Sequence, residues 1–179
     1  MKALKEYTIQ FVGLKEGEHN FDFNIDNTFF QNFEYDEFNE VDVKIDLKLI
    51  KKTTLLELYF SASGHVNVNC DLTNEPYNQV VEDKFKLVVK FGAEYNDDNE
   101  DILIVPHGEY EINIAQYIYE LIVLAVPAKR VHPGVEDGTL KSEILSKLEE
   151  LSPKQDSKTK SSEDIDPRWN NLKKLLTDK

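Results

Sequence analysis

One cysteine and four histidines offer the widest range of chemistry in this chain of 179 residues. A structural zinc site needs three or four ligands at close spacing. Cys70 offers a thiol ligand and His132 an imidazole ligand, but they lie far apart in the sequence. They are therefore at most a remnant of a metal site. Nothing beside Cys70 activates its sulfur as a nucleophile, and no glycine-rich phosphate loop is present. We expect a protein that is not an enzyme and has no cofactor.

The C-terminal segment holds the single tryptophan and one of the two arginines. Asp166 can cap a helix whose first position suits Pro167. Trp169, Leu172 and Leu176 then form one apolar stripe on that helix. A helix this short is marginal in water, so we expect the segment to dock on a partner.

The residues expected to contact this partner are Asp166, Pro167, Arg168, Trp169, Leu172, Lys173 and Leu176. Trp169 would be the apolar anchor and Arg168 a charged or stacking contact. Lys173 and its neighbour Lys174 would attract phosphate. One alternative stays open, in which the segment folds back and completes the core of its own domain.

The first half of the chain alternates apolar and polar residues, which predicts β-strands. Residues 7–11 and 21–25 are expected to form a hairpin, and Asp26 to cap a short helix. A tight turn is expected at Gly64. Further strands are predicted at 41–49, 55–60, 66–70, 81–91 and 102–105.

The pattern changes to a helical period after these strands. Asn113 is the predicted N-cap of a helix over 114–126, with Gln116 completing a partial capping box. This helix is apolar nearly all round, so we expect it to be buried, and Pro127 to end it. Residues 139–151 predict an amphipathic helix.

These elements predict an α+β fold that is predominantly β. We expect an antiparallel β-meander curled into a barrel or sandwich, with a buried helix and a helical, partly disordered C-terminal tail. The predicted parts are a β-rich domain with its closing helix (1–127), a loop and amphipathic helix (128–151), a flexible polar linker (152–165) and a docking segment (166–179).

The formal net charge of −13 is unevenly distributed. Residues 1–126 carry 24 acidic and 10 basic side chains, which disfavours non-specific binding of DNA or RNA by this part. Any RNA contact is expected from local clusters such as Lys51–Lys52, Lys129–Arg130 or the tail. No apolar run approaches the ~20 residues of a membrane span, and the start lacks the apolar segment of a secretory signal. We therefore expect a cytoplasmic protein.

Three features occur in an order that resembles the YceD family, the large ribosomal RNA subunit accumulation proteins. A cysteine closes a strand and opens a polar loop at 70–76, a helix over 112–127 ends in an apolar run and proline, and the chain finishes with the Asp-Pro-Arg-Trp motif. The resemblance implies a non-enzymatic bacterial factor that supports biogenesis of the large ribosomal subunit. Its partner would be large-subunit rRNA or a pre-ribosomal particle.

The resemblance is incomplete where the family carries cysteines. Many members have a Cys-x-x-Cys pair where this chain has Cys70 and Thr73, and further cysteines where it has residues 129–133. An inherited zinc site is therefore not expected. An alternative function is a protein-binding adaptor that docks through its Asp-Pro-Arg-Trp segment without contacting RNA.

Overall fold

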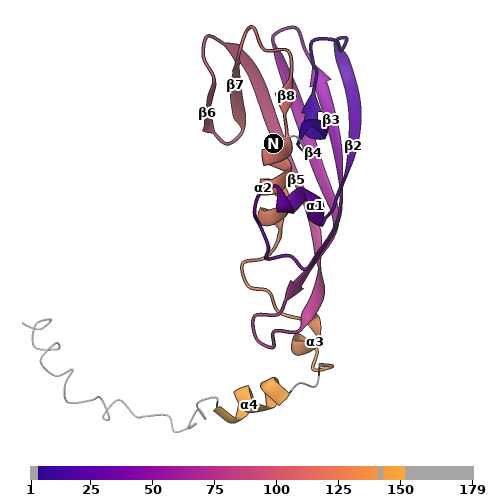
Figure 1. The fold of residues 1–179 in the computed structure, drawn as a ribbon, viewed down its shortest axis with the longest axis vertical. Helices are drawn as coiled ribbons and strands as arrows, with labels where there is room; N and C mark the ends of the chain where they lie inside the picture. Colours follow the sequence, from indigo (N-terminus) through magenta and orange to yellow (C-terminus); the bar gives the residue numbers. More distant parts are fainter. Residues whose placement is uncertain (1–3, 141–142, 152–179) are drawn as a thin grey trace, which may run out of the picture. The chain divides into compact units, whose positions relative to one another are not determined.

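A six-stranded sheet is the centre of the computed structural model, which describes residues 4–140 and 143–151 (Figure 1). The strands lie in the order β2-β3-β4-β5-β7-β6, so the sheet is open, with β2 and β6 at its edges. The strand bounds are β2 Gly17–Ile25, β3 Glu40–Lys51, β4 Leu55–Asn69, β5 Pro76–Gly92, β6 Asn96–Asn99 and β7 Ile102–Pro106. The predicted α+β, mainly β class is confirmed, but the predicted closure into a barrel is wrong.

Shorter elements complete the described chain. β1 (Thr8–Ile9) and β8 (Ile112–Asn113) form a separate two-stranded antiparallel sheet. The helices are the 3-10 turn η1 Lys5–Tyr7, α1 Asn27–Gln31, α2 Ala115–Ala125, α3 Pro133–Glu136 and α4 Glu143–Leu151. None of the helices in this described part has the length and apolar content that spanning a bilayer requires.

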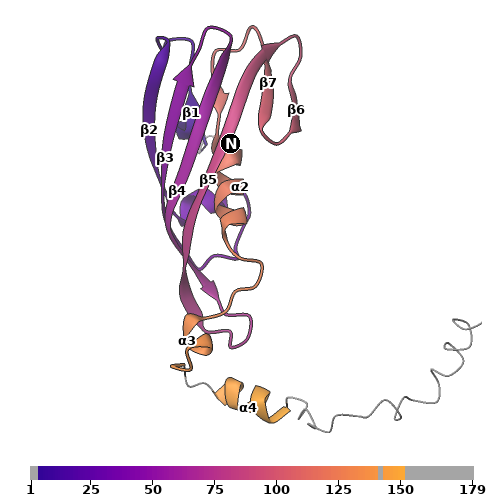
Figure 2. The ribbon, with the colours of Figure 1, turned by 180° about the vertical axis from the view of Figure 1, so that it is seen from behind.

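The large sheet buries only one of its faces. Along β3 every second side chain is buried, from Val41 to Leu49, and the residues between them are exposed. β4 follows the same alternation in its first half. Because successive side chains of a strand point to opposite faces, one face forms the core and the other faces solvent. α1 and α2 lie together on the core face, and Figure 2 shows the open face in front of them.

α2 supplies the apolar cover of the core face. Ile118 and Ile122 are fully buried and Leu121 is 5 % exposed. The predicted N-cap is wrong, because the helix begins at Ala115 and its N-cap residue is Ile114, which makes no side-chain cap hydrogen bond. The Asn113 side chain, one residue earlier, accepts a hydrogen bond from the Ala115 N–H at 3.0 Å. The predicted capping box is wrong, because the Gln116 side chain binds within the helix instead. The helix ends before Pro127, as predicted.

An aromatic cluster joins α1 to α2. Asp26 caps α1 through the backbone N–H groups of Thr28 and Phe29, as the sequence predicted. This places Phe30 and Phe33 against Tyr119 of α2, and the Phe33 and Tyr119 rings stack at 4.4 Å between centroids. Such ring pairs each contribute about 0.5–1.5 kcal/mol beyond the area they bury.

Two predicted strand pairings are wrong. β2 pairs with β3 over all nine of its residues, whereas β1 offers only two positions and pairs with β8. The expected hairpin of 7–11 with 21–25 is therefore not formed. The chain between the predicted strands at 81–91 and 102–105 contains β6, which pairs with β7, and β7 lies beside β5 in a parallel pairing. The sheet is thus not a pure antiparallel meander.

Gly64 lies inside β4 and not in the predicted turn. It pairs with Val43 on one side and with Val81 on the other. Its φ is +153°, and a Cβ at this position would lie 2.2 Å from the Asp42 carbonyl oxygen. Only glycine permits this close approach of two strands without strain.

We predict that Gly64→Ala lowers the free energy of unfolding by about 2–4 kcal/mol, because the added methyl group forces β3 and β4 apart. Gly13→Ala is the matched control, since a Cβ at Gly13 meets nothing within 4 Å. Urea denaturation measures both. Equal midpoints for the two variants would contradict the close approach.

Candidate functional site

Three segments that are distant in sequence meet around Cys70. The chain turns tightly after β4, where the Cys70 N–H donates to the Glu75 carbonyl at 2.9 Å and the Asn74 N–H donates to the Cys70 carbonyl at 2.8 Å. Asn74 has a φ of +58°, a left-handed conformation that asparagine tolerates. The turn is therefore specified by its own residues and presents Cys70 at a fixed position.

Arg130, which follows α2, ties this turn to the loop after α1. The Asp71 N–H donates to the Arg130 carbonyl at 2.8 Å, and the Arg130 N–H donates to the Asp71 carboxylate at 2.7 Å. The guanidinium is 3.0 Å from the Glu37 carboxylate and 3.7 Å from that of Asp71. Arg130 is thus a structural clamp between two acidic residues.

The Cys70 sulfur is buried and accepts hydrogen bonds. The His132 backbone N–H lies 3.3 Å from Sγ. Burial by itself raises the pKa of the thiol, but hydrogen bonds from the Thr73 hydroxyl and from the N–H groups of His132 and Leu72 outweigh this and hold the pKa below its ordinary value. The His132 ring has another task, since its Nδ1 accepts from the Gly134 N–H at 2.9 Å and caps α3.

The donor set around Cys70 does not fit a zinc ion. Cys70 and His132 do come together, but His132 offers the sulfur its backbone N–H, and its Nδ1 is already hydrogen-bonded. Thr73 and the Arg130 guanidinium occupy the surroundings in which further thiolates would be needed. Within residues 4–140 and 143–151, no three His, Cys, Asp or Glu side chains are grouped to hold a metal ion. The residues around Cys70 therefore form a hydrogen-bonded junction that holds the turn after β4 to the segment after α2.

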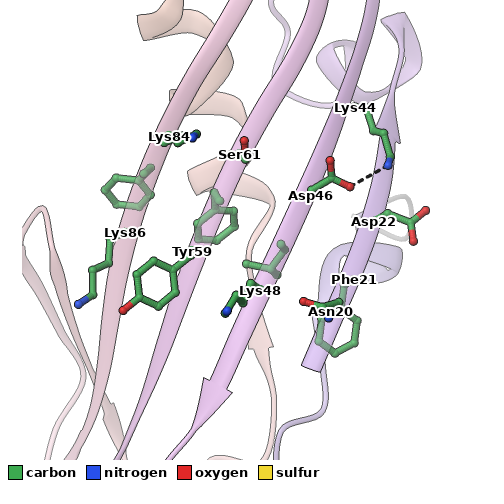
Figure 3. A pocket seen from close by; sticks show the side chains of 13 residues that line it. Asn20, Phe21, Asp22, Lys44, Asp46, Lys48, Tyr59, Ser61, Lys84 and Lys86 are labelled. Carbon is green, nitrogen blue, oxygen red and sulfur yellow. Dashed lines mark ion pairs between the residues drawn. The ribbon is translucent and has the colours of Figure 1, made fainter. Parts of the chain in front are cut away.

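The solvent face of the sheet carries a second candidate site (Figure 3). A shallow hollow of about 540 Å³ crosses β2 to β5. Two aspartates, Asp22 and Asp46, line it together with four lysines, Lys44, Lys48, Lys84 and Lys86. Glu18 and Glu57 pair with Lys48 and Lys86, so four carboxylates stand beside the four lysines. The hollow is therefore close to neutral on a part of the chain whose net charge is −14, and its lysines are the groups in it that attract phosphate.

The geometry keeps these lysines available. Two form exposed ion pairs, Lys44 with Asp46 (2.8 Å) and Lys48 with Glu18 (2.8 Å). The third, Lys86, lies 3.4 Å from Glu57, whose side chain is only 15 % exposed and also pairs with Lys52. Exposed pairs of this kind contribute only about 0–1 kcal/mol, so a phosphate can replace the carboxylate at little cost. The Lys86 ammonium also lies 5.0 Å above the centre of the Tyr59 ring, which places an aromatic face among the cations.

The basic clusters that the sequence offered as possible RNA contacts form hydrogen bonds and ion pairs within the domain. The Lys51 ammonium donates to the carbonyls of Phe11 and Leu14, both at 2.8 Å, and fastens the N-terminal segment to β3. Lys52 pairs with Glu57 at 2.7 Å. Sequence reasoning missed the lysines of the sheet face. These lysines occupy the outward positions of period-two strands, which the sequence does show. Only the strand register places Lys48 and Lys86 on either side of Tyr59, with Lys44 and Lys84 in neighbouring rows.

The predicted docking residues, from Asp166 to Leu176, lie outside the described residues, as does the predicted linker. Their roles stay predictions.

A family model described as "Large ribosomal RNA subunit accumulation protein YceD" matches residues 58–176. The chain belongs to the YceD family. The match begins within β4 and includes the Cys70 turn, α2 and the Asp-Pro-Arg-Trp motif. Lys84 and Lys86 lie inside the YceD region, whereas Lys44 and Lys48 precede it. Comparisons with curated proteins and with solved structures gave no significant match.

We predict that Cys70, the only cysteine, reacts with iodoacetamide at pH 7 at least about tenfold more slowly in the folded protein than in urea, because folding buries its sulfur. Mass spectrometry of timed samples gives both rates. A folded-state rate above that in urea would mean an accessible, activated thiolate and would revive a catalytic role.

Proposed function

We propose that this protein supports the accumulation of large-subunit ribosomal RNA by binding, without catalysing a reaction, in the cytoplasm where ribosomal subunits are assembled. The observation that carries the proposal is the YceD family match, which spans both the folded domain and the C-terminal motif. A buried, fully hydrogen-bonded Cys70 supports the non-enzymatic part, because a nucleophile must reach its substrate.

RNA contact through the open face of the sheet is the mode that the described residues favour. Lys44, Lys48 and Lys86 have side chains that are 51 %, 45 % and 47 % exposed, long enough to follow a phosphate backbone. Tyr59 lies among them and offers a ring on which an unpaired base can stack. The flanking acidic surface would repel RNA elsewhere and so restrict it to this face.

The tail would supply a second contact. Arg168 and Trp169 form a charged and an aromatic anchor, the residue types that dominate small interfaces. The alternative function, an adaptor that docks through this motif onto protein alone, is favoured by the net charge of −14 over residues 1–126. The two functions differ in whether RNA is touched directly.

We predict that the intact protein co-sediments with large-subunit precursors on a sucrose gradient and that Arg168→Ala with Trp169→Ala abolishes this, because both anchors are removed. Truncation after Leu151 should act in the same way. The melting temperature should stay nearly unchanged. A large fall in melting temperature would instead mean that the segment belongs to the core of its own domain.

We predict that Lys44→Ala, Lys48→Ala and Lys86→Ala together weaken binding to a transcribed fragment of large-subunit rRNA. The slope of log affinity against log salt should fall in magnitude by about 2, as expected for three lost phosphate contacts. Lys5→Ala, Lys15→Ala and Lys147→Ala together are the control for the loss of three charges elsewhere on the exposed surface. Equal effects of both sets, or no RNA binding by the parent protein, would favour the adaptor.

A further inference from the structure

A groove of about 940 Å³ lies between α2 and the β6–β7 pair, and it shares Lys84 and Phe85 of β5 with the hollow that holds the lysines. Figures 1 and 2 both place α2 beside this pair of strands. Its floor is apolar and consists of the buried side chains of Leu103 and Val105 from β7 and of Ile112 and Leu121.

Large apolar side chains at the rim of the groove are left in water. Leu124, in the last turn of α2, is 79 % exposed, and Tyr95, just before β6, is 59 % exposed. Between them the Tyr117 ring stacks on Phe85, with 6.1 Å between centroids and 16° between planes. An exposed leucine beside an aromatic pair and an apolar floor is typical of a surface that a partner covers.

Carboxylates surround this apolar surface. The β6–β7 side contributes Asp97, Glu100 and Asp101. Glu109, Glu111 and Glu120 lie along the other side.

Asp83 is a further carboxylate of the groove, and Lys84 is its single cation. In the part of the chain that the structure describes, no ion pair neutralises any of the groove carboxylates. The hydrogen bonds that Asp97 and Glu120 accept come from the neutral side chains of Tyr95 and Gln116. Burial, and then the nearby Tyr95 and these two carboxylates, raise the pKa of Tyr117 to about 12.

A strand edge borders the same groove. β5 pairs with β7 only from Val88 onwards, so in the described chain the edge of β5 that faces away from β4 is unpaired before that residue. Asp83 and Phe85, which line the groove, belong to this open stretch. Unpaired N–H and C=O groups along an edge suit an extended polypeptide.

We propose that this groove binds a lysine- and arginine-rich polypeptide segment that carries an apolar anchor. The anchor would seat against Leu124 and Tyr117, and the cations would reach the carboxylates on both sides. The negative potential that attracts such a segment repels nucleic acid. The inference goes beyond the proposed function and does not depend on it, because RNA contact is assigned to Lys44, Lys48, Lys86 and Tyr59, and none of these residues lines the groove.

The test uses the full chain and two short fluorescent peptides of lysine and arginine, one with two central leucines and one with serines in their place. Anisotropy should show that the leucine peptide binds the parent protein and the serine peptide binds at least about tenfold more weakly. Leu124→Ala should weaken binding of the leucine peptide to a similar extent. The melting temperature should not change, because Leu124 is exposed in the folded protein.

Charge is tested separately with isosteric changes. We expect a triple variant, Asp97→Asn with Glu109→Gln and Glu120→Gln, to bind the leucine peptide more weakly. The dependence of that binding on salt should also fall. Glu40→Gln, Asp42→Asn and Glu82→Gln remove the same charge from the exposed solvent face of the sheet and should have little effect. Equal weakening by both sets, or equal binding of both peptides, would mean non-specific charge attraction and would overturn the proposal.

The groove could instead be occupied by another segment of the same chain or by a second copy of the protein. Each gives a distinct result, and either result would overturn the proposal that a separate partner binds there. Much tighter peptide binding after truncation at Leu151 would mean that residues 152–179 of the same chain occupy the groove. A dimer in sedimentation that Leu124→Ala converts to a monomer would mean that a second copy occupies it.

Discussion

One short helix covers one face of a much longer sheet, and the rest of the structure follows from this mismatch. α2 has 11 residues and spans about 16 Å. β4 has 15 residues and spans about 50 Å. The remaining length of the core face must be covered by other elements. The aromatic cluster of α1 covers the region beside Tyr119, and the β6–β7 pair bounds the region beside Tyr117, where the cover is incomplete and a groove remains.

The same arrangement separates charge on the domain. Because only one face is buried, the outward rows of β3, β4 and β5 are free to carry lysines, and strand register gathers Lys48, Tyr59 and Lys86 into one row. Carboxylates surround instead the groove between α2 and the β6–β7 pair. A chain of high net negative charge thus presents one surface suited to phosphate and another suited to basic polypeptide.

The sequence predicted those features that depend on local pattern. The alternation in β3, the Asp26 cap of α1 and the end of α2 at Pro127 each follow from neighbouring residues, and all three were correct. Features that depend on pairing between distant segments were missed. Gly64 was assigned to a turn because an isolated glycine does not reveal that two strands must approach closely. The parallel position of β7 beside β5 has no local signature at all. For the site, the structure brings Cys70 and His132 together, but through the His132 backbone N–H, which the sequence did not show. The lysine row and the acidic groove emerge only from register and packing.

The central claim is that the protein acts on large-subunit rRNA by direct contact through the open face of its sheet. Ultraviolet crosslinking in cells, followed by sequencing of the bound RNA and mass spectrometry of the crosslinked peptides, tests it most directly. The expected result is enrichment of large-subunit rRNA, with crosslinks on β3 to β5 around Tyr59 and none in the acidic groove. Absence of large-subunit rRNA from the crosslinked material, or crosslinks confined to the groove, would contradict it.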